Sequence, residues 1–266
     1  MANDSNAAAQ TGAGPTAMVA VEQFFPANQR LINDDVAYQI LPLGSRIFVQ
    51  MMRLPLLRNW MVSATEKQIK GIWGGIMCRK RYIDDKLSEV LTQENLPIVN
   101  LGAGFDTRAY RLPALRNTPV WEVDQSVNIE TKRSGIQHAF GEIPAHVKLV
   151  SINFEDQTLG DVLASYGYTP NTKTFFIWEA VTQYLTEEGF RATFEFLSQA
   201  PSGSRLAFTY VLRDFIEGKN LYGQETVYKQ MIVKDTVWRF GMNPDEVAGI
   251  LEPYGGELVG DCSYQE

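Results

Sequence analysis

Hydrophobic and polar positions change their pattern once along this chain, close to residue 97. Before it, apolar residues recur at roughly helical spacing, and Pro42 and Pro55 divide the segment into short pieces. After it, short and almost wholly apolar runs alternate with helical stretches. The runs predicted to be strands are 97–104, 119–124, 147–154, 173–180 and 204–211. Runs that are apolar throughout are typical of parallel strands buried on both faces of a sheet.

Five strands alternating with helices predict an α/β fold with a doubly wound, mostly parallel sheet of the Rossmann-like type. A single domain is expected over 18–266, with a helical cap at 18–94 and the α/β core at 97–211. Residues 212–242 break the alternation with many aromatic residues, which predicts a helical insertion over the carboxyl edge of the sheet. Residues 243–266 are expected to add a helix and, at 257–263, a possible sixth strand.

Capping residues mark the start of several helices. Thr186 precedes two glutamates, which predicts a helix over 186–199. Asn243 is followed by Pro244 at the first helical position, and acids fill the first turn. The segment Asn33-Asp34-Asp35 offers another helix cap before an apolar stretch.

Composition limits the kind of protein this is. The chain has 266 residues, 45% of them hydrophobic, and a net charge of -7, so it can bury a full core and lacks the basic surface that nucleic-acid binding needs. No apolar run reaches the ~18 residues of a membrane span, so no membrane partner is expected. Cys78 and Cys262 lie far apart, which favours reduced thiols and a cytoplasmic location. Residues 1–17 are expected to be a disordered tail.

The most informative segment lies at the end of the first predicted strand. There an apolar run ends in Gly102-Ala103-Gly104, which leaves bare backbone for a nucleotide-like ligand. Asp124 follows 20 residues after Gly104, at the end of the next apolar run, where a carboxylate suits a ribose diol. The two features together predict a nucleoside-containing cofactor.

The residues after the glycines indicate which nucleoside. A nicotinamide dinucleotide motif would place a third glycine where this chain has Thr107. Asp106 would repel a diphosphate, but it would not repel a cofactor whose reactive end carries an ammonium and a sulfonium. S-adenosyl-L-methionine is therefore the predicted cofactor, and a nicotinamide oxidoreductase is disfavoured.

Four segments together form a specific pattern: Asn100–Leu112, Cys78–Asp85, Trp121–Gln125 and Phe176–Leu185. In their order and spacing they resemble the leucine carboxyl methyltransferase family of class I S-adenosylmethionine-dependent enzymes. The likeness covers roughly residues 18–260 and is greatest to the bacterial branch, whose substrates are mostly unassigned or small molecules.

The resemblance implies roles for individual residues. Gly102, Ala103 and Gly104 would lie against the cofactor's amino-acid moiety, and Asp124 with Gln125 would hold the ribose. Arg79 would pair with the cofactor carboxylate, because a guanidinium matches that group bidentately, and Arg81 is the alternative for this role. Glu179 would bind the ammonium and, with Tyr184, border the reacting groups. Asp106 is expected to hold the loop rather than touch the sulfonium.

The adenine contact departs from the family pattern. The family carries an acid followed by an apolar residue after the third strand, whereas this chain has Asn153 and Phe154. An amide oxygen still accepts a hydrogen bond from the adenine amino group.

A small-molecule O-methyltransferase acting on a carboxylate or acidic hydroxyl is the function these features favour. The chain has just two histidines, His138 and His146, both between the second and third predicted strands. The scarcity of histidine favours an acceptor that is ionised without a general base. Two alternatives stay open: a protein C-terminal carboxyl methyltransferase, and a cofactor-binding protein without catalysis.

The end of the chain departs from the family, which usually continues for some tens of residues. Glu266 follows directly after the possible sixth strand. A truncated chain and an absent final hairpin are both open, and an exposed edge on the fifth strand would favour pairing with another chain. The oligomeric state and the methyl acceptor are not determined by the sequence.

Overall fold

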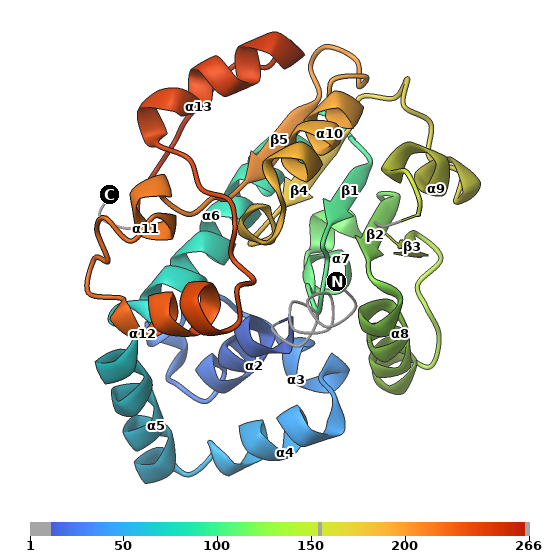
Figure 1. Ribbon diagram of the computed structural model, residues 1–266. Helices are drawn as coiled ribbons and strands as arrows, with labels where there is room; N and C mark the ends of the chain where they lie inside the picture. The colour runs from blue at the N-terminus through green and yellow to red at the C-terminus, as the bar shows by residue number, and fades with distance from the viewer. Residues whose placement is uncertain (1–11, 154–155, 264–266) are drawn as a thin grey trace.

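The computed structural model describes residues 12–153 and 156–263. All five predicted strands are present, and each lies within its predicted run. They are β1 (Ile98–Leu101), β2 (Val120–Asp124), β3 (Val147–Ser151), β4 (Phe175–Trp178) and β5 (Arg205–Phe208). They form one sheet in the order β3-β2-β1-β4-β5, and all four neighbouring pairs are parallel. The predicted doubly wound α/β class is therefore confirmed (Figure 1).

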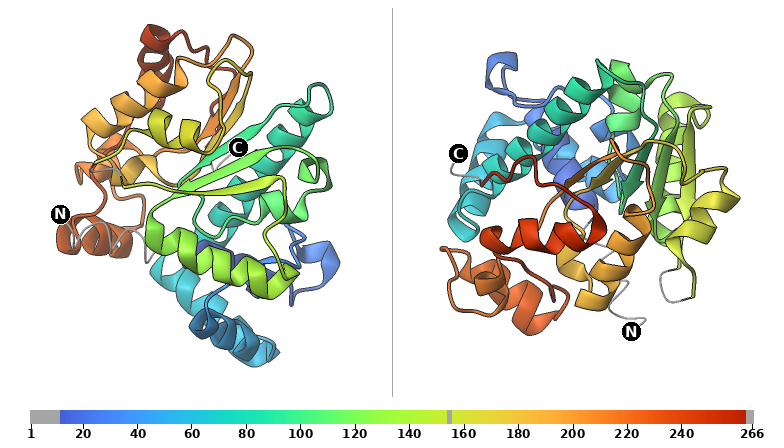
Figure 2. Two further views of the ribbon diagram at one scale, coloured as in Figure 1. Left: turned by 90° about the vertical axis from the view of Figure 1, so that its right-hand side faces the viewer. Right: turned by 90° about the horizontal axis from the view of Figure 1, so that it is seen from above.

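Helices cover both faces of this sheet (Figures 1 and 2). The N-terminal helices are α2 (Ala13–Glu22), α3 (Ala37–Ile40), α4 (Leu43–Met51), α5 (Pro55–Gln68) and α6 (Ile72–Leu91). Those of the core are α7 (Arg108–Arg111), α8 (Ser126–Phe140), α9 (Leu159–Ser165) and α10 (Glu187–Leu197). The later ones are α11 (Arg213–Ile216), α12 (Glu225–Tyr228), a π-helix (Lys229–Lys234) and α13 (Pro244–Leu251). Short 3-10 turns occur at Ala27–Gln29, Pro113–Leu115, Thr182–Tyr184 and Glu252–Tyr254.

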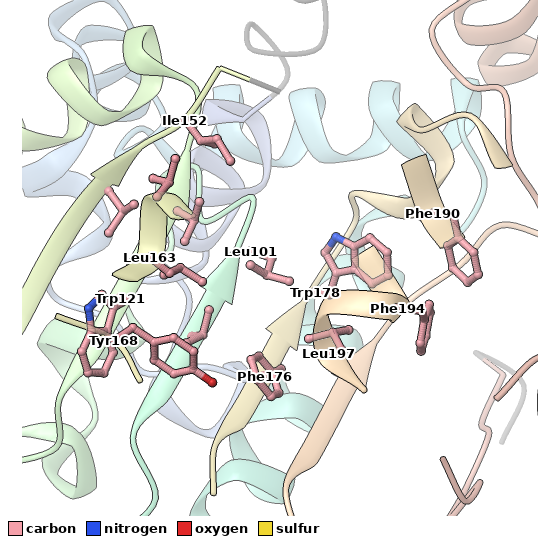
Figure 3. Close-up of a cluster of buried hydrophobic side chains, with 14 of the residues drawn as sticks. Leu101, Trp121, Ile152, Leu163, Tyr168, Phe176, Trp178, Phe190, Phe194 and Leu197 are labelled. Carbon is pink, nitrogen blue, oxygen red and sulfur yellow. The ribbon is translucent and has the colours of Figure 1, made fainter. Parts of the chain in front are cut away.

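Two apolar clusters pack against the sheet, one on each face, and a third, the N-terminal cluster, joins helices α2, α3, α4 and α6. One face packs against α9, α10 and α13, where Trp178 stacks on Phe190 and meets Phe194 edge-on (Figure 3). The other face packs against α6 and α8 through residues such as Leu87 and Ile136. Strands covered on both faces explain why their sequences are apolar at successive positions rather than alternating.

The predicted caps lie at the starts of their helices. The Thr186 hydroxyl accepts a hydrogen bond from the Gly189 amide at 3.1 Å at the start of α10. Asp34 accepts from the amides of Val36 and Ala37 at the start of α3. Asn243 occupies the N-cap position before Pro244 at the start of α13, although its side chain accepts no capping hydrogen bond there.

The prediction of a disordered tail over 1–17 is wrong for residues 13–17, which belong to α2. Their small side chains pack closely against the core, and α2 contacts α3, α4 and α6. Alanine and glycine are common in disordered tails, but their small size also permits such close helix packing. Residues 1–11 lie outside the described residues.

The prediction of a sixth strand at 257–263 is also wrong, since no strand occurs at these positions. A strand needs a neighbouring strand with matching backbone groups, and none of the described strands pairs with this segment. Instead it lies against α6 and the end of β5. The Cys262 sulfur lies 3.7 Å from the Tyr82 hydroxyl, and Tyr210 donates to Asp261.

Candidate active site

The glycine loop follows β1 at the carboxyl edge of the sheet. Gly102 (φ +69°) and Gly104 (φ +43°) adopt the left-handed conformation that glycine accepts without strain. A Cβ atom on Gly102 would lie 2.3 Å from Cγ2 of Val181, too close for any side chain. The amides of Gly102 and Ala103 donate to the carbonyl oxygen of Val123 at 2.8 and 3.0 Å. The loop is therefore fixed to β2, and its first turn admits only glycine.

Asp124 ends β2 directly beside this loop. Its Oδ2 accepts a hydrogen bond from the Gly104 amide at 2.6 Å. Its Oδ1 accepts from the Gln125 amide at 2.7 Å and from the Asn128 side chain at 2.8 Å. A carboxylate has about four lone-pair positions, so these three protein donors leave room for a further one. Asp124 is thus oriented by the glycine loop and retains capacity for a ligand hydroxyl.

Helix α2 covers the other side of the same loop. The Thr16 hydroxyl donates to the carbonyl oxygen of Phe105 at 2.9 Å, and Thr16 is buried. A Cβ atom on Gly104 would lie 3.8 Å from the backbone of Gly12. Helix α2, which begins before the predicted helical cap at 18–94, therefore contributes to the wall of the site.

Glu179 follows β4, the other neighbour of β1, and is 8% exposed at its side chain. One oxygen, Oε1, lies 2.8 Å from Nε of Arg79 and 3.7 Å from Nζ of Lys80. The other, Oε2, accepts from Nη1 of Arg108 at 2.7 Å. The next residue, Ala180, has φ +59°, and its amide donates to the Thr209 hydroxyl at 2.7 Å. A strained backbone at this point indicates that the surrounding structure determines where Glu179 lies.

Arg108 is the centre of the cluster, with its side chain only 2% exposed. Its guanidinium contacts the carboxylates of Asp84 at 2.6 Å, Asp106 at 2.5 Å and Glu179 at 2.7 Å. Asp106 also accepts from the Arg108 amide at 2.8 Å and from the Asn100 side chain at 3.0 Å. These contacts fix the loop after β1, which is the role predicted for Asp106.

The ionisation of these carboxyl groups follows from their neighbours. Burial raises the pKa of the Asp106 carboxyl, but the charges of Arg108 and Lys80 outweigh it and hold that pKa well below its usual range. Burial likewise opposes ionisation of Glu179, and the charges of Lys80, Arg108 and Arg79 hold its pKa well below normal. The pKa of Arg108 is raised despite burial, by Asp106, Glu179 and Asp84. All three side chains are charged at neutral pH.

The cluster continues away from the loop through a second arginine. Arg111 contacts Asp84 at 2.5 Å and Asp34 at 3.3 Å, and the Thr107 hydroxyl donates to Asp34 at 2.5 Å. Burial raises the pKa of the Asp34 carboxyl, although Arg111 and Thr107 oppose the shift. The connected side chains comprise four cations and four anions, namely Arg79, Lys80, Arg108 and Arg111 with Asp34, Asp84, Asp106 and Glu179.

A balanced cluster of this kind suits a zwitterionic ligand. An incoming carboxylate could take the place of Glu179 at Arg79, while an incoming ammonium takes the place of Arg79 at Glu179. Arg79 and Glu179 each keep an opposite charge in contact after this exchange, so no buried charge is left unpaired. The structure brings Arg79 and Glu179 together. Their roles at the two ends of an amino acid stay a prediction.

Arg81, the alternative to Arg79, does not join the cluster. It lies on another side of α6, where its Nε is 2.8 Å from Asp85 and its side chain is 55% exposed. Asn153 is exposed, and its Nδ2 donates to Asp156 at 2.7 Å. Phe154, the second residue predicted to hold adenine, lies outside the described residues.

The residues after β4 meet the insertion. Tyr184, in the 3-10 turn after Glu179, makes an edge-to-face contact with Trp238, with ring centroids 6.3 Å apart. Trp238 in turn meets Phe215, also at 6.3 Å. The backbone amide of Arg239 donates to the carbonyl oxygen of Gln183 at 2.7 Å. Residues 212–242 thus place an aromatic wall beside the segment that carries Glu179.

Neither histidine lies in this region. His146 contacts the carbonyl oxygen of Ala109 at 3.0 Å at the amino end of β3, and His138 is on α8. Among the described residues, no group of three or more histidine, cysteine or acidic side chains is arranged to hold a metal ion. The described helices include none that is both long and apolar enough to span a membrane.

Several residues of the site are not predicted from the sequence, and Arg108 and Asn128 are the two that bear most directly on it. Arg108 belongs to the glycine segment, but its position in the sequence gives no sign that it meets the carboxylates of Asp84, Asp106 and Glu179. Asn128 orients Asp124 from the first turn of α8. Its position four residues after Asp124 was the only available signal, because a residue at that distance can reach back across one turn.

A sequence profile of the leucine carboxyl methyltransferase family matches residues 13–198. The chain therefore belongs to this family. A relative from Bacillus subtilis (strain 168), the putative S-adenosyl-L-methionine-dependent methyltransferase YktD, is 34% identical over 136 residues. That match covers 50% of this chain and 44% of the relative. A putative S-adenosyl-L-methionine-dependent methyltransferase from Mycobacterium avium (strain 104) is 29% identical over 211 residues, covering 77% of this chain and 68% of the relative.

Solved structures with a related arrangement of elements share little sequence with this chain. An O-methyltransferase family protein from Burkholderia thailandensis has a TM-score of 0.44 at 15% identity, covering 67% of this chain and 54% of that one. Human N-acetylserotonin methyltransferase, solved in complex with SAM, has a TM-score of 0.40 at 14% identity. This match covers 66% of this chain and 50% of the human chain.

Proposed function

We propose that this chain is an S-adenosyl-L-methionine-dependent methyltransferase that methylates a carboxylate or an acidic hydroxyl of a small molecule. The observation that carries the proposal is the Arg79–Glu179 pair, set in a charge-balanced cluster beside the glycine loop. A zwitterionic amino-acid end on a nucleoside is the ligand feature that this combination fits. Membership of the leucine carboxyl methyltransferase family and the names of the relatives support the same cofactor.

The described residues fit S-adenosylmethionine at three points. Asp124 has capacity for a ribose hydroxyl beside Gly104. Gly102 leaves the backbone bare where any Cβ would meet Val181. Arg79 and Glu179 would hold the carboxylate and the ammonium. No phosphate-binding group is needed, which agrees with the carboxylate of Asp106 near the start of the short helix α7.

The bound cofactor would supply a methyl group on a positively charged sulfur, which leaves as a neutral thioether. The residues of this chain then contribute alignment and exclusion of water rather than proton transfer at the leaving group. Glu179 holds the amino-acid end in place, since Arg108 and the Ala180 turn fix its carboxylate. The aromatic contact of Tyr184 with Trp238 provides an apolar boundary on the acceptor side.

The side chains that surround this region support the proposed acceptor class. Neither His138 nor His146 is positioned to remove a proton. Glu179 is committed to cations, and its lowered pKa makes it a weak base. An acceptor that is ionised on its own, such as a carboxylate with a pKa near 4, needs no general base. The aromatic rings of Tyr184, Trp238 and Phe215 favour an acceptor with an apolar body.

Ligand binding followed by product detection tests both levels of this proposal. Thermal unfolding should shift upward with S-adenosylmethionine and with its demethylated product, but not with NAD. Stabilisation by NAD alone would contradict the cofactor. A mass-spectrometric screen of small carboxylic acids and phenols should then show a gain of one methyl group. Transfer only to a peptide C-terminus would contradict the acceptor class and leave the cofactor assignment intact.

A further inference from the structure

Helices α4 and α5 carry a stripe of apolar side chains that no other part of the described chain covers. These helices extend along the lower side of the molecule in Figure 1. The exposed residues are Leu43 (66%), Ile47 (56%), Phe48 (42%), Met51 (52%), Leu54 (64%), Leu56 (88%) and Trp60 (67%). Clusters of this kind on a protein surface mark interaction sites, whereas single exposed apolar residues need no explanation. We call these seven residues the outer stripe.

The outer stripe is additional to an inner apolar face on the same helices. Val49 and Met52 are almost fully buried in the N-terminal cluster, and Leu57 and Met61 pack against it. A surface helix normally has one apolar face and an opposite polar face. Helix α10 follows that rule, with Phe190 inward and exposed charges outward. Helices α4 and α5 have apolar side chains on two sides, so their outer side is built to contact something.

The stripe on each helix has a regular period. Leu43 and Ile47 are four residues apart on α4, and Leu56 and Trp60 are four apart on α5, so each pair shares a face. Lys67 lies seven residues after Trp60, which places its ammonium on the same side of α5.

Basic residues accompany the stripe in a chain that is otherwise acidic. Residues 43–70 contain five basic residues and one acid, whereas the chain as a whole has a net charge of -7. Arg53, Lys67 and Lys70 are exposed. The one acid, Glu66, accepts hydrogen bonds from the amides of Gly71 and Trp73 and so serves the start of α6. The exposed charged side chains of residues 43–70 are therefore cationic.

We propose that the outer stripe docks this protein on an anionic lipid surface, with α4 and the start of α5 lying in the plane of the interface. Helices that bind in this way combine apolar and tryptophan side chains on one face with lysine or arginine beside them. Anionic headgroups attract such cations. A symmetric pairing with a second copy fits less well, because a two-fold axis would bring Arg53, Lys67 and Lys70 of both copies to one interface.

Co-sedimentation with vesicles tests the proposal directly. The full chain should bind vesicles of phosphatidylcholine and phosphatidylglycerol in equal parts at least tenfold more tightly than vesicles of phosphatidylcholine alone. Added salt should weaken the binding, because the charges at the surface are screened. Trp60, the most exposed of the five tryptophans, should shift its emission to the blue on binding. A Trp60→Phe variant should bind similarly and lack most of that shift.

A stripe variant and a matched control separate this surface from general stickiness. Leu56→Ser with Trp60→Ser should reduce vesicle binding at least tenfold, because both side chains are exposed and would lose their contact with lipid. Val233→Ser with Val259→Ser removes two apolar side chains of similar exposure, 61% and 85%, elsewhere on the chain, and should change binding less than twofold. Circular dichroism and thermal unfolding check that both variants fold.

Three results would overturn the proposal. The first is the absence of vesicle binding by the full chain. The second is binding that the stripe variant leaves unchanged. The third is a dimer, detected by sedimentation velocity without lipid, that the stripe variant converts to monomer, because a second copy would then be the occupant. The result does not depend on methyl transfer, so it is independent of the proposed function.

Discussion

The Arg79 guanidinium and the Glu179 carboxylate lie 2.8 Å apart, although 100 residues separate them in the sequence. The family resemblance gives them opposite ends of the same ligand moiety, the carboxylate and the ammonium. In the structure the two opposite charges form an ion pair with each other. Binding of an amino-acid end would exchange this contact for two contacts with the ligand, supported on one side by Arg108.

Arg79→Gln and Glu179→Gln should each lower the affinity for S-adenosylmethionine at least tenfold, measured by calorimetry. Each change removes one charged hydrogen-bonding partner of the zwitterion, and contacts of this kind are worth about 2 kcal/mol or more. Arg81→Gln is the matched control, since it removes the same kind of charge from the same helix outside the cluster. A loss of affinity in Arg81→Gln alone would show that the alternative arginine is the ligand.

Asp124→Ala should also lower cofactor affinity at least tenfold, because it removes the ribose acceptor and frees the Gly104 amide. Asn128→Ala should produce a smaller loss, because it removes one of three donors that orient Asp124. Glu130→Ala, which changes an exposed acid on α8, should leave affinity within about twofold. Unchanged affinity in Asp124→Ala would rule out the assigned ribose contact.

Gly102→Ala should destabilise the protein by more than the ~1–2 kcal/mol of a left-handed alanine, because its Cβ would also overlap Val181 at 2.3 Å. The double variant Gly102→Ala with Val181→Ala should relieve the overlap but keep the backbone strain. Urea unfolding of the four species of this cycle would give a coupling of about 1 kcal/mol or more. Purely additive effects would contradict the overlap.

The pH dependence of stability should carry the signature of the Arg108 cluster. The pKa of Asp106 is lowered on folding, so its contribution is present above its unfolded value near 4 and is lost as the pH falls further. The free energy of unfolding should therefore fall between about pH 5 and pH 3. Asp106→Asn removes this titration and should show a flatter profile, whereas Asp35→Asn, an exposed neighbour of α3, should match the wild type.

Opposite behaviour is expected of the buried Asp34, whose folded pKa is raised. Its contribution is present at low pH and is lost as the pH rises through the folded pKa. The free energy of unfolding should therefore fall as the pH rises from about 4, the unfolded value, through the folded pKa of Asp34, and Asp34→Asn should remove this fall. An acid-side profile of Asp34→Asn as flat as the one expected for Asp106→Asn would contradict the assignment of the two groups.

Much of the core was predictable because its signal is local. An apolar run ending in Gly102-Ala103-Gly104 identifies a buried parallel strand and the loop after it, and β1 lies within that run. The prediction of a sixth strand was wrong because a strand forms only beside a neighbouring strand, and no local sequence pattern shows whether one is present. The start of helix α2 was not predictable, because small residues are common both in flexible tails and in tightly packed helices.

The sequence by itself determined the order of strands and helices along the chain, the glycine turn after the first strand and the position of Asp124 at the end of the second. Each of these follows from neighbouring residues along the chain. Only the tertiary structure decided that Arg79, Arg108 and Glu179 meet, since their segments converge only when α6, the loop after β1 and β4 pack together. It also decided that Leu56 and Trp60 face outward. Periodicity tells which residues share a helix face, but packing decides which face is covered.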